Sequence, residues 1–314
     1  MPWPFSKKNQ PDPPEGSSAP EHSTVDSSSK ASSALYERIH ETRPAPLDVP
    51  YLLPKDSDEI NRLDFQHHLL RAMLKGNTTV PLTHPISSIL DVGSGTGIWG
   101  SEMAQDFPEA QIVGIDLQEV QRPDKPENYM FVQCNLLDGI PFPNNYFDFV
   151  HMRFLINAIP KAMWPTVIQT LFQVTRPGGT IELIEAGGDP YRPGGWACTR
   201  MYEAVIQVAA FRGIDPREMY NLGNHCKQAG FTQIQTRKIE APIGRWSGRA
   251  GTMLATDMTE GMKSFKEPIQ KIVGYTAWQF DDLTDQVVRE WEEYHSTYTC
   301  VIYTAQKPLT DTYR

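Results

Sequence analysis

The feature that most constrains the fold is a glycine-rich turn, DVGSGTG at residues 91–97, between an apolar run and a helical pattern. The run SSILDVG predicts a strand buried on both faces, and residues 97–106 predict a helix. Glycines let a backbone approach a ligand closely, and the start of the following helix presents unpaired N–H groups there. The turn therefore predicts a ligand site at the carboxyl end of a buried strand.

The rest of the chain continues this alternation of strands and helices. Four further apolar runs, QIVGIDL, MFVQCN, FDFVHM and TIELIEA, predict strands, with a helix at 161–175. Short strands separated by helices favour a parallel sheet covered on both faces. The late alternating runs FTQIQTRKIEAPIG and TYTCVIYTAQKP predict an antiparallel edge hairpin, which completes seven strands. Helices are predicted at 249–265 and 284–295, between these two late strands in the sequence, and they would form a lid.

The acids around the turn indicate what kind of ligand it binds. Asp116 ends the second predicted strand, nineteen residues after Gly97, where a carboxylate can accept the hydroxyl protons of an adenosine ribose. Gly95, Gly97 and Gly100 also match the dinucleotide pattern GxGxxG, but the strand closes earlier, at Gly93, and Asp91 would repel a pyrophosphate. Asp91 suits a ligand with an amino group and a sulfonium. The structural alternative is a plain turn whose aspartate caps a helix.

Composition excludes several classes of protein. A net charge of -9 disfavours a binder of duplex nucleic acid, and four scattered cysteines without a CxxC pair predict a reduced, intracellular protein. No apolar run predicts a signal peptide or a membrane span, so we expect a soluble, cytoplasmic protein, with the nucleus as the alternative. Asp64 and His68 lie one helical turn apart, with His67 turned away, but without a third ligand we expect no metal site.

Four blocks carry a resemblance to a known family: DVGSGTGIW, VGIDL, PFPNNYFDFVHMRF and RPGGTIELIE. They resemble the class I S-adenosylmethionine (SAM)-dependent methyltransferases over most of residues 89–185. The segment YLLPKDSDEINRLDFQHHLL and the closing AQKP resemble, more narrowly, fungal methyltransferases like the velvet-complex regulator of secondary metabolism. The resemblance implies a Rossmann-like class I methyltransferase fold and SAM as the cofactor.

Residue roles follow from this resemblance. It implies that Asp91, Gly93, Ser94 and Gly95 pack against the methionine part of SAM, that Asp116 holds the ribose, and that Leu117 lines the adenine. Further cofactor contacts are expected from Asn135, Leu136 and Met152, and from Tyr51, Arg62 and Gln66 of the preceding segment. Asn135 stands where the family commonly has an acid. Tyr51 as a surface anchor and Arg62 as a solvated charge are the structural alternatives.

For the chemistry, His151 and Arg153 follow the fourth strand at the ligand-binding edge, where His151 could deprotonate an acceptor. A hydrogen-bonded structural histidine is the alternative. We expect the acceptor pocket to be built from residues 191–211 and from a lid rich in methionine and aromatic residues, unless these form the core of the lid itself. The lid residues in question are Trp246, Met253, Met258, Met262, Phe265, Tyr275, Trp278 and Phe280.

These expectations divide the chain into five segments. Residues 1–34, with eight serines between Ser17 and Ser33, predict a disordered tail. Residues 35–80 would cover the cofactor, 81–244 form the SAM-binding core, 245–297 the helical lid, and 298–314 the last strand and a C-terminal tail. The expected activity is methyl transfer to a small secondary metabolite by in-line displacement. The alternatives are a SAM-binding regulator in a protein complex, a SAM-binding enzyme that transfers no methyl group, and a dehydrogenase.

Overall fold

The structure, a computed structural model, describes residues 57–82, 85–119 and 125–309. The predicted tail at 1–34 and Tyr51 lie outside this part of the chain. The strands within it are β1 (Ser88–Val92), β2 (Gln111–Asp116), β3 (Tyr129–Gln133), β4 (Phe147–Arg153), β5 (Thr175–Ala186), β6 (Thr232–Pro242) and β7 (Thr297–Gln306). The α-helices are α2 (Ser57–Leu74), α3 (Ile98–Asp106), α4 (Trp164–Val174), α5 (Trp196–Phe211), α6 (Leu222–Ala229), α7 (Arg249–Lys263), α8 (Lys266–Ile272) and α9 (Ala277–Glu293).

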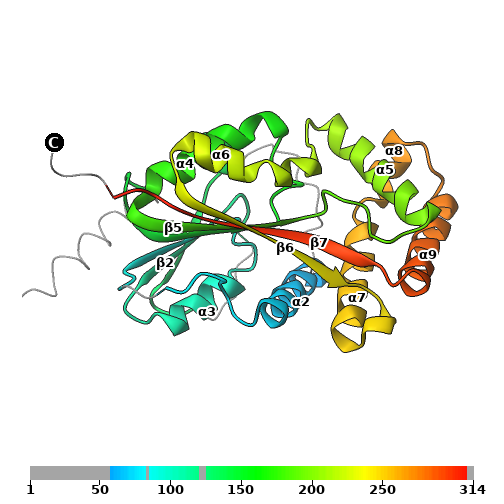
Figure 1. Ribbon diagram of the computed structural model, residues 1–314, viewed down its shortest axis with the longest axis horizontal. Helices are drawn as coiled ribbons and strands as arrows, with labels where there is room; N and C mark the ends of the chain where they lie inside the picture. The colour runs from blue at the N-terminus through cyan, green and yellow to red at the C-terminus, as the bar shows by residue number, and fades with distance from the viewer. Residues whose placement is uncertain (1–56, 83–84, 120–124, 310–314) are drawn as a thin grey trace, which may run out of the picture. The chain divides into compact units, whose positions relative to one another are not determined.

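The described strands form one sheet in the order β3-β2-β1-β4-β5-β7-β6. The first five run parallel, whereas β7 is antiparallel to both β5 and β6. In Figure 1, α2 and α3 lie on one side of this sheet and α4 and α6 on the other. The predicted parallel sheet with an antiparallel edge hairpin is therefore confirmed. Because β1 lies between β2 and β4, the strand order reverses there, and ligands of open α/β sheets bind at that edge.

Gly100, the last glycine of the GxGxxG match, lies where a helix packs closely on a strand. A Cβ on Gly100 would lie 2.3 Å from Cε2 of Tyr129, so this glycine lets α3 lie directly against β3. The residue is needed for the contact between helix and strand, and its position inside α3 is too far along the chain to shape the turn. The third glycine of the dinucleotide pattern has the same packing role, so this contact does not distinguish the two interpretations. The end of β1 at Val92, which makes Gly93 the first residue of the turn, is the observation against the dinucleotide register.

A helical cap, formed by α5, α7, α8 and α9, has a hydrophobic core of its own. Met262 and Phe280 are buried in this core, and Met253, Met258, Phe265 and Tyr275 pack against it. Trp278 is 72% exposed and Trp246 is 37% exposed. Most of the predicted pocket residues thus pack within the cap, as the structural alternative held. Helix α8 and the first two turns of α9 were not predicted, although Thr276 and Gln279 form a capping box that marks the start of α9.

Within the cap, a carboxylate of α9 caps the first turn of α5. The backbone N–H groups of Gly195, Ala197 and Cys198, at the start of α5, donate hydrogen bonds to the carboxylate of Glu290 in α9 at 3.1, 2.8 and 2.8 Å. Because these are orphan donors at a positive helix end, Glu290→Ala should lower the free energy of unfolding by about 2 kcal/mol in urea denaturation. The control is Glu293→Ala, an exposed position in the same helix, with an expected change below about 0.5 kcal/mol. Equal losses would contradict the capping role.

Among the described helices, none has the length and apolar character needed to cross a membrane. The four cysteines are all buried and free.

Candidate functional site

The turn between β1 and α3 is built on three glycines with left-handed backbone. Gly93, Gly95 and Gly97 have φ values of 70°, 53° and 74°, a region that side chains with a Cβ disfavour. The N–H groups of Gly93 and Ser94 donate to the carbonyl of Ile115 in β2, at 2.8 and 3.0 Å. These bonds fix the turn at the end of the neighbouring strand.

Asp116 at the end of β2 connects the turn to the next loop. Its Oδ2 accepts a hydrogen bond from the N–H of Gly95 at 2.9 Å, and its Oδ1 accepts one from Gln118 at 3.1 Å. The carboxyl is half-buried, and burial raises its pKa above the ordinary range although the backbone bonds act against this. The glycine turn and Asp116, both predicted as parts of the site, are thus in direct contact.

Asp91 contributes a buried carboxylate with a free acceptor. The residue is 2% exposed, and its Oδ2 has no hydrogen-bond partner among the described residues. The Oγ of Ser94 is buried without a partner in the same way. A buried acceptor of this kind is costly unless something pairs with it, so Asp91 indicates a position where a ligand supplies the missing donor. The side chain of Ser94 lies against Gly114 of β2, where an added Cβ would be 3.0 Å from its Oγ.

The same burial gives the stability of the ligand-free protein a pH dependence. Burial raises the pKa of Asp91 to about 6, compared with roughly 3.9 in an unfolded chain. The folded state therefore holds this proton more tightly, and the stabilisation that the proton gives is complete below about pH 4 and lost as the pH rises towards about 6. Urea denaturation across this range should show a loss in the wild type that is absent in Asp91→Asn. Identical pH profiles would contradict the assignment.

Helix α2 connects the turn to the cap. The hydroxyl of Thr96 donates to Asp64 at 2.6 Å. On the next turns of the helix, Arg62 and Gln66 donate to the two carboxylate oxygens of Asp257 in α7, at 3.2 and 3.0 Å. Asp257 is 1% exposed, and it was not predicted. Asp257 lies three residues after the buried Leu254, so the sequence places an acid on the apolar face of α7. This unusual position is the sequence feature that could have indicated a functional residue.

A second chain of polar contacts runs from β4 through α2 to α3. Arg153 donates to Nδ1 of His67 at 3.1 Å, so the Nε2–H of that ring faces Glu102 at 3.0 Å. Burial, followed by the charge of Arg153, lowers the pKa of His67 to about 4. His67 was expected to turn away, but it lies with His68 and Glu102, whose ligand atoms are all within 4.8 Å of one another. Both ring nitrogens of His67 are already engaged, which leaves it no lone pair for a metal.

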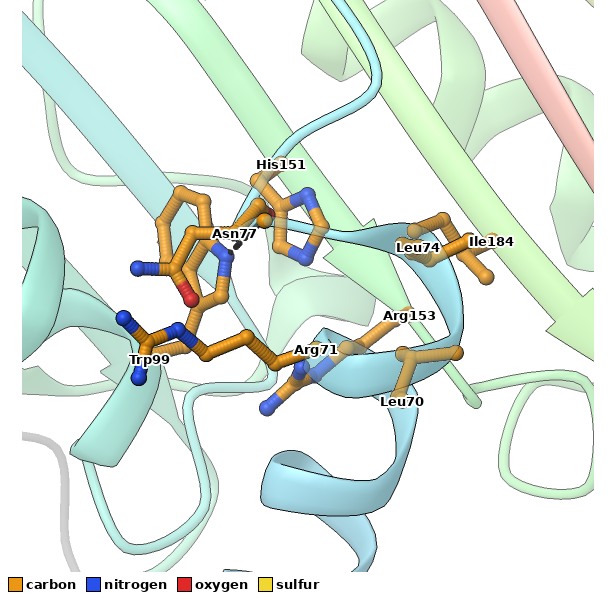
Figure 2. Close-up of a pocket in the computed structure, with 9 residues that line it drawn as sticks. Leu70, Arg71, Leu74, Asn77, Trp99, His151, Arg153 and Ile184 are labelled. Carbon is orange, nitrogen blue, oxygen red and sulfur yellow. Dashed lines mark hydrogen bonds between the residues drawn. The ribbon is translucent and has the colours of Figure 1, made fainter. Parts of the chain in front are cut away.

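The structure does not support a catalytic base at His151. The side chain is fully buried, stacks on Trp99 with ring centroids 4.1 Å apart, and places Nδ1 3.1 Å from Glu182. Figure 2 shows the ring beside Trp99, above Arg71 and Arg153. This enclosed space has no volume for a water molecule. The ring is held through Nδ1, and its buried Nε2 has no hydrogen-bond partner among the described residues. These contacts fit the structural alternative, and the role of His151 as a base stays a prediction.

The remaining predicted residues divide into an edge group and a core residue. Leu117, Asn135 and Leu136 are half-buried after β2 and β3, at the ligand-binding edge. Asn135 caps the short helix Leu136–Asp138, accepting from Leu137 at 3.1 Å and donating to Asp138 at 3.0 Å. Met152 differs, because its side chain is fully buried within β4. The predicted contact between the Met152 side chain and the cofactor is therefore not supported.

The strand order and the acid-flanked glycine turn are those of the Rossmann-like fold of class I methyltransferases. A family model described as a methyltransferase domain matches residues 89–179. Among solved structures, a SAM-dependent methyltransferase from Archaeoglobus fulgidus is similar with a TM-score of 0.48 and 14% identity, over 80% of this chain and 100% of that one.

Two curated fungal proteins are similar over most of the chain. The methyltransferase pytC of Aspergillus terreus is 29% identical over 279 residues, which cover 82% of this chain and 83% of that protein. The secondary metabolism regulator laeA of Fusarium oxysporum f. sp. lycopersici is 30% identical over 280 residues, with 82% and 87% covered. The chain belongs to the class I SAM-dependent methyltransferases, in the fungal group that includes these relatives. S-adenosyl-L-methionine is the cofactor of this family.

Proposed function

We propose that this protein transfers a methyl group from SAM to a small secondary metabolite. The observation that supports this most is the unpaired, buried Oδ2 of Asp91 beside a glycine turn that Asp116 holds in place. A carboxylate of this kind fits the ammonium group of an amino acid, and an acid at the end of β2 fits a ribose. The residues present therefore fit SAM better than they fit a pyrophosphate-containing nucleotide.

The proposed cofactor site is formed by the edge residues. Asp91 and Ser94 would hold the amino-acid part, Asp116 the ribose hydroxyls, and Leu117, Asn135 and Leu136 the adenine. SAM supplies a methyl group on a positively charged sulfur, which is an electrophile for in-line attack. Residues 57–80, the described part of the segment predicted to cover the cofactor, would lie over it, and the lid at 245–297 would exclude water from the acceptor.

We assign the rate enhancement mainly to alignment in a dry site. His151 is fully buried and stacked on Trp99, and Arg153 is bonded to His67, so we assign neither of them the removal of a proton from an acceptor. Holding the nucleophile and the methyl carbon in line can supply several kcal/mol of the barrier without a base. An acceptor that is readily deprotonated, such as a phenol or an enol, suits a site of this kind.

The second candidate function is that of a SAM-binding regulator of secondary metabolism in a protein complex. It is favoured by the 30% identity to a protein named as such a regulator. We place either function in the cytoplasm or the nucleus, and neither requires nucleic acid or a membrane. Purification of the tagged protein from its source organism separates the candidates, because a stoichiometric partner protein would favour the regulator.

The experiment that tests the proposed function follows the label of methyl-labelled SAM. The purified protein is incubated with an extract of its source organism, and small molecules are then separated from protein and nucleic acid. Label in the small-molecule fraction is expected, and its mass identifies the acceptor. Label in protein alone, or no transfer despite SAM binding, would contradict the proposal.

A further inference from the structure

A groove of about 520 Å³ lies between α6 and the last two strands, apart from the ligand-binding edge. This volume is within the range of small-molecule sites in proteins. The lining residues come from the α6 region (Tyr220, Gly223, Asn224 and Lys227), from β6 (Ile234, Thr236 and Lys238) and from β7 (Val301 and Tyr303). None of these residues belongs to the methyl-transfer site described above.

The groove exists because α6 covers only part of the sheet. A Cβ on Gly223 would lie 3.0 Å from Cε1 of Tyr303, so the helix rests directly on this ring, which is 3% exposed. Helix α6 has 8 residues, whereas β6 has 11, and Thr236 and Lys238 are exposed beyond the helix. The result is a groove whose base rests on the buried Tyr303 and Val301 and whose open side presents Ile234 and Tyr220.

The walls of the groove are positively charged. Lys227 and Lys238 line it together, and the nine lining residues include no carboxylate. Lys227 forms no ion pair with any residue in the described part of the chain, and Lys238 lies 3.3 Å from the exposed Glu240. A local basic site of this kind contrasts with the net charge of -9 of the whole chain. Its charge complements an anion.

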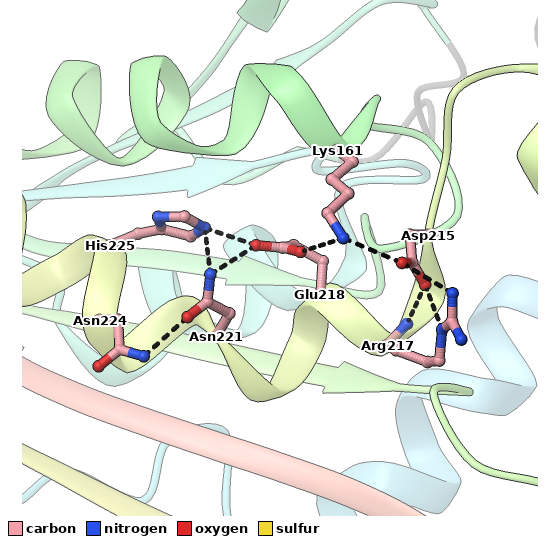
Figure 3. A network of polar contacts seen from close by, with 7 residues as sticks. All are labelled: Lys161, Asp215, Arg217, Glu218, Asn221, Asn224 and His225. Atoms are coloured by element: carbon pink, nitrogen blue, oxygen red, sulfur yellow. Dashed lines mark hydrogen bonds and ion pairs between the residues drawn. The ribbon is translucent and has the colours of Figure 1, made fainter.

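A polar network holds the start of α6, the helical wall of the groove (Figure 3). Glu218 accepts from Asn221 at 2.8 Å, and its carboxylate lies 2.7 Å from Nε2 of His225 and 3.5 Å from Lys161. Asn221 in turn accepts from Asn224 at 2.7 Å. Glu218 thus has its own partners, and the groove side of α6 keeps the charge of Lys227. Two carboxylates border the groove through lining residues, because Asp189 accepts from the hydroxyl of Tyr220 and Glu240 pairs with Lys238.

We propose that this groove binds a small organic anion, with its carboxylate or phosphate at Lys227 and Lys238 and its planar or apolar body over Ile234 and Tyr220. The groove lies on the α6 side of the sheet, whereas α2 and α3 cover the opposite face (Figure 1). The site is therefore independent of the proposed methyl transfer. It is a second ligand site.

The test compares two probes of the same shape in the full-length protein saturated with S-adenosylhomocysteine. Fluorine NMR measures the binding of para-fluorobenzoate and of the neutral para-fluorobenzamide. The acid should bind about tenfold more tightly than the amide, because two ammonium groups face its carboxylate. In Lys227→Gln combined with Lys238→Gln, the affinity for the acid should fall to that for the amide. Equal affinities in the wild type would overturn the proposal.

Two further variants separate a groove from a diffuse charge effect. Thr236→Trp fills the groove from an exposed strand position and should weaken both probes at least fivefold. Lys263→Gln combined with Lys271→Gln removes two exposed lysines of α7 and α8 and should change neither affinity. Melting temperatures verify that each variant is folded. Unchanged binding in Thr236→Trp, or an equal loss in the control, would contradict a built site.

Discussion

Asp91→Asn should weaken SAM binding by about 100-fold, as measured by isothermal titration calorimetry. The reason is that the variant replaces a buried carboxylate, whose Oδ2 has no partner in the described protein, with a neutral amide. Losing one partner of a buried charged pair costs several kcal/mol, and 100-fold corresponds to about 2.7 kcal/mol. The same substitution should stabilise the cofactor-free protein near neutral pH, because burial raises the pKa of Asp91 more than the nearby charge of Arg153 lowers it.

The prediction is specific because Asp91→Asn should lower the affinity for SAM and, at the same time, raise the stability of the cofactor-free protein. A variant that merely damaged the fold would lose both stability and affinity. The control is Glu109→Gln, which changes an exposed acid before β2, away from the proposed cofactor residues, and should alter the affinity less than about threefold. Weaker binding with reduced stability, or unchanged binding, would contradict the role of Asp91.

The second large effect is expected on stability, from Trp99→Ala. Trp99 is 1% exposed, stacks on His151, and donates its indole N–H to the carbonyl of Asn77 at 2.7 Å. Removing it leaves a large cavity between α3 and the sheet, and the free energy of unfolding should fall by about 4 kcal/mol in urea denaturation. Because α3 begins at the glycine turn, SAM affinity should also decrease.

Two variants control this prediction. Trp278→Ala removes a side chain that is 72% exposed and should cost less than about 1 kcal/mol. Trp99→Phe keeps a ring on His151 but loses the indole hydrogen bond, so it should cost about 1 to 2 kcal/mol, and it remains measurable if the alanine variant does not fold. A loss below about 1.5 kcal/mol for Trp99→Ala would show that Trp99 does not hold α3 against the sheet.

Local patterns predicted the sheet and the ligand edge because their determinants are close in sequence. The spacing from Gly97 to Asp116 spans one helix and one strand, and Asp116 does contact Gly95 of the turn. Helix α8 was missed because its 7 residues, with Pro268 in the first turn, are too few for a periodicity to appear. Local sequence therefore predicts the elements that are long enough to show a hydrophobic periodicity or a characteristic spacing.

Side-chain partners at long range could not be predicted. Asp257 is 195 residues from Arg62 and 191 from Gln66, and only the packing of α7 on α2 brings them together. His151 lies near the end of β4, where a catalytic base of such a sheet is expected, but it is stacked on Trp99 of a different element. A histidine at a strand end has the same sequence signal in either role, and tertiary contacts decide between them.

The most direct test of the central claim is the stoichiometry of the products formed from SAM. The protein is incubated with SAM and the acceptor-containing small-molecule fraction, and S-adenosylhomocysteine and the methylated small molecule are quantified together by mass spectrometry. We predict equal amounts of both with the wild type and a strong reduction of both with Asp91→Asn. A new product without S-adenosylhomocysteine, or S-adenosylhomocysteine without a methylated small molecule, would contradict methyl transfer to a metabolite.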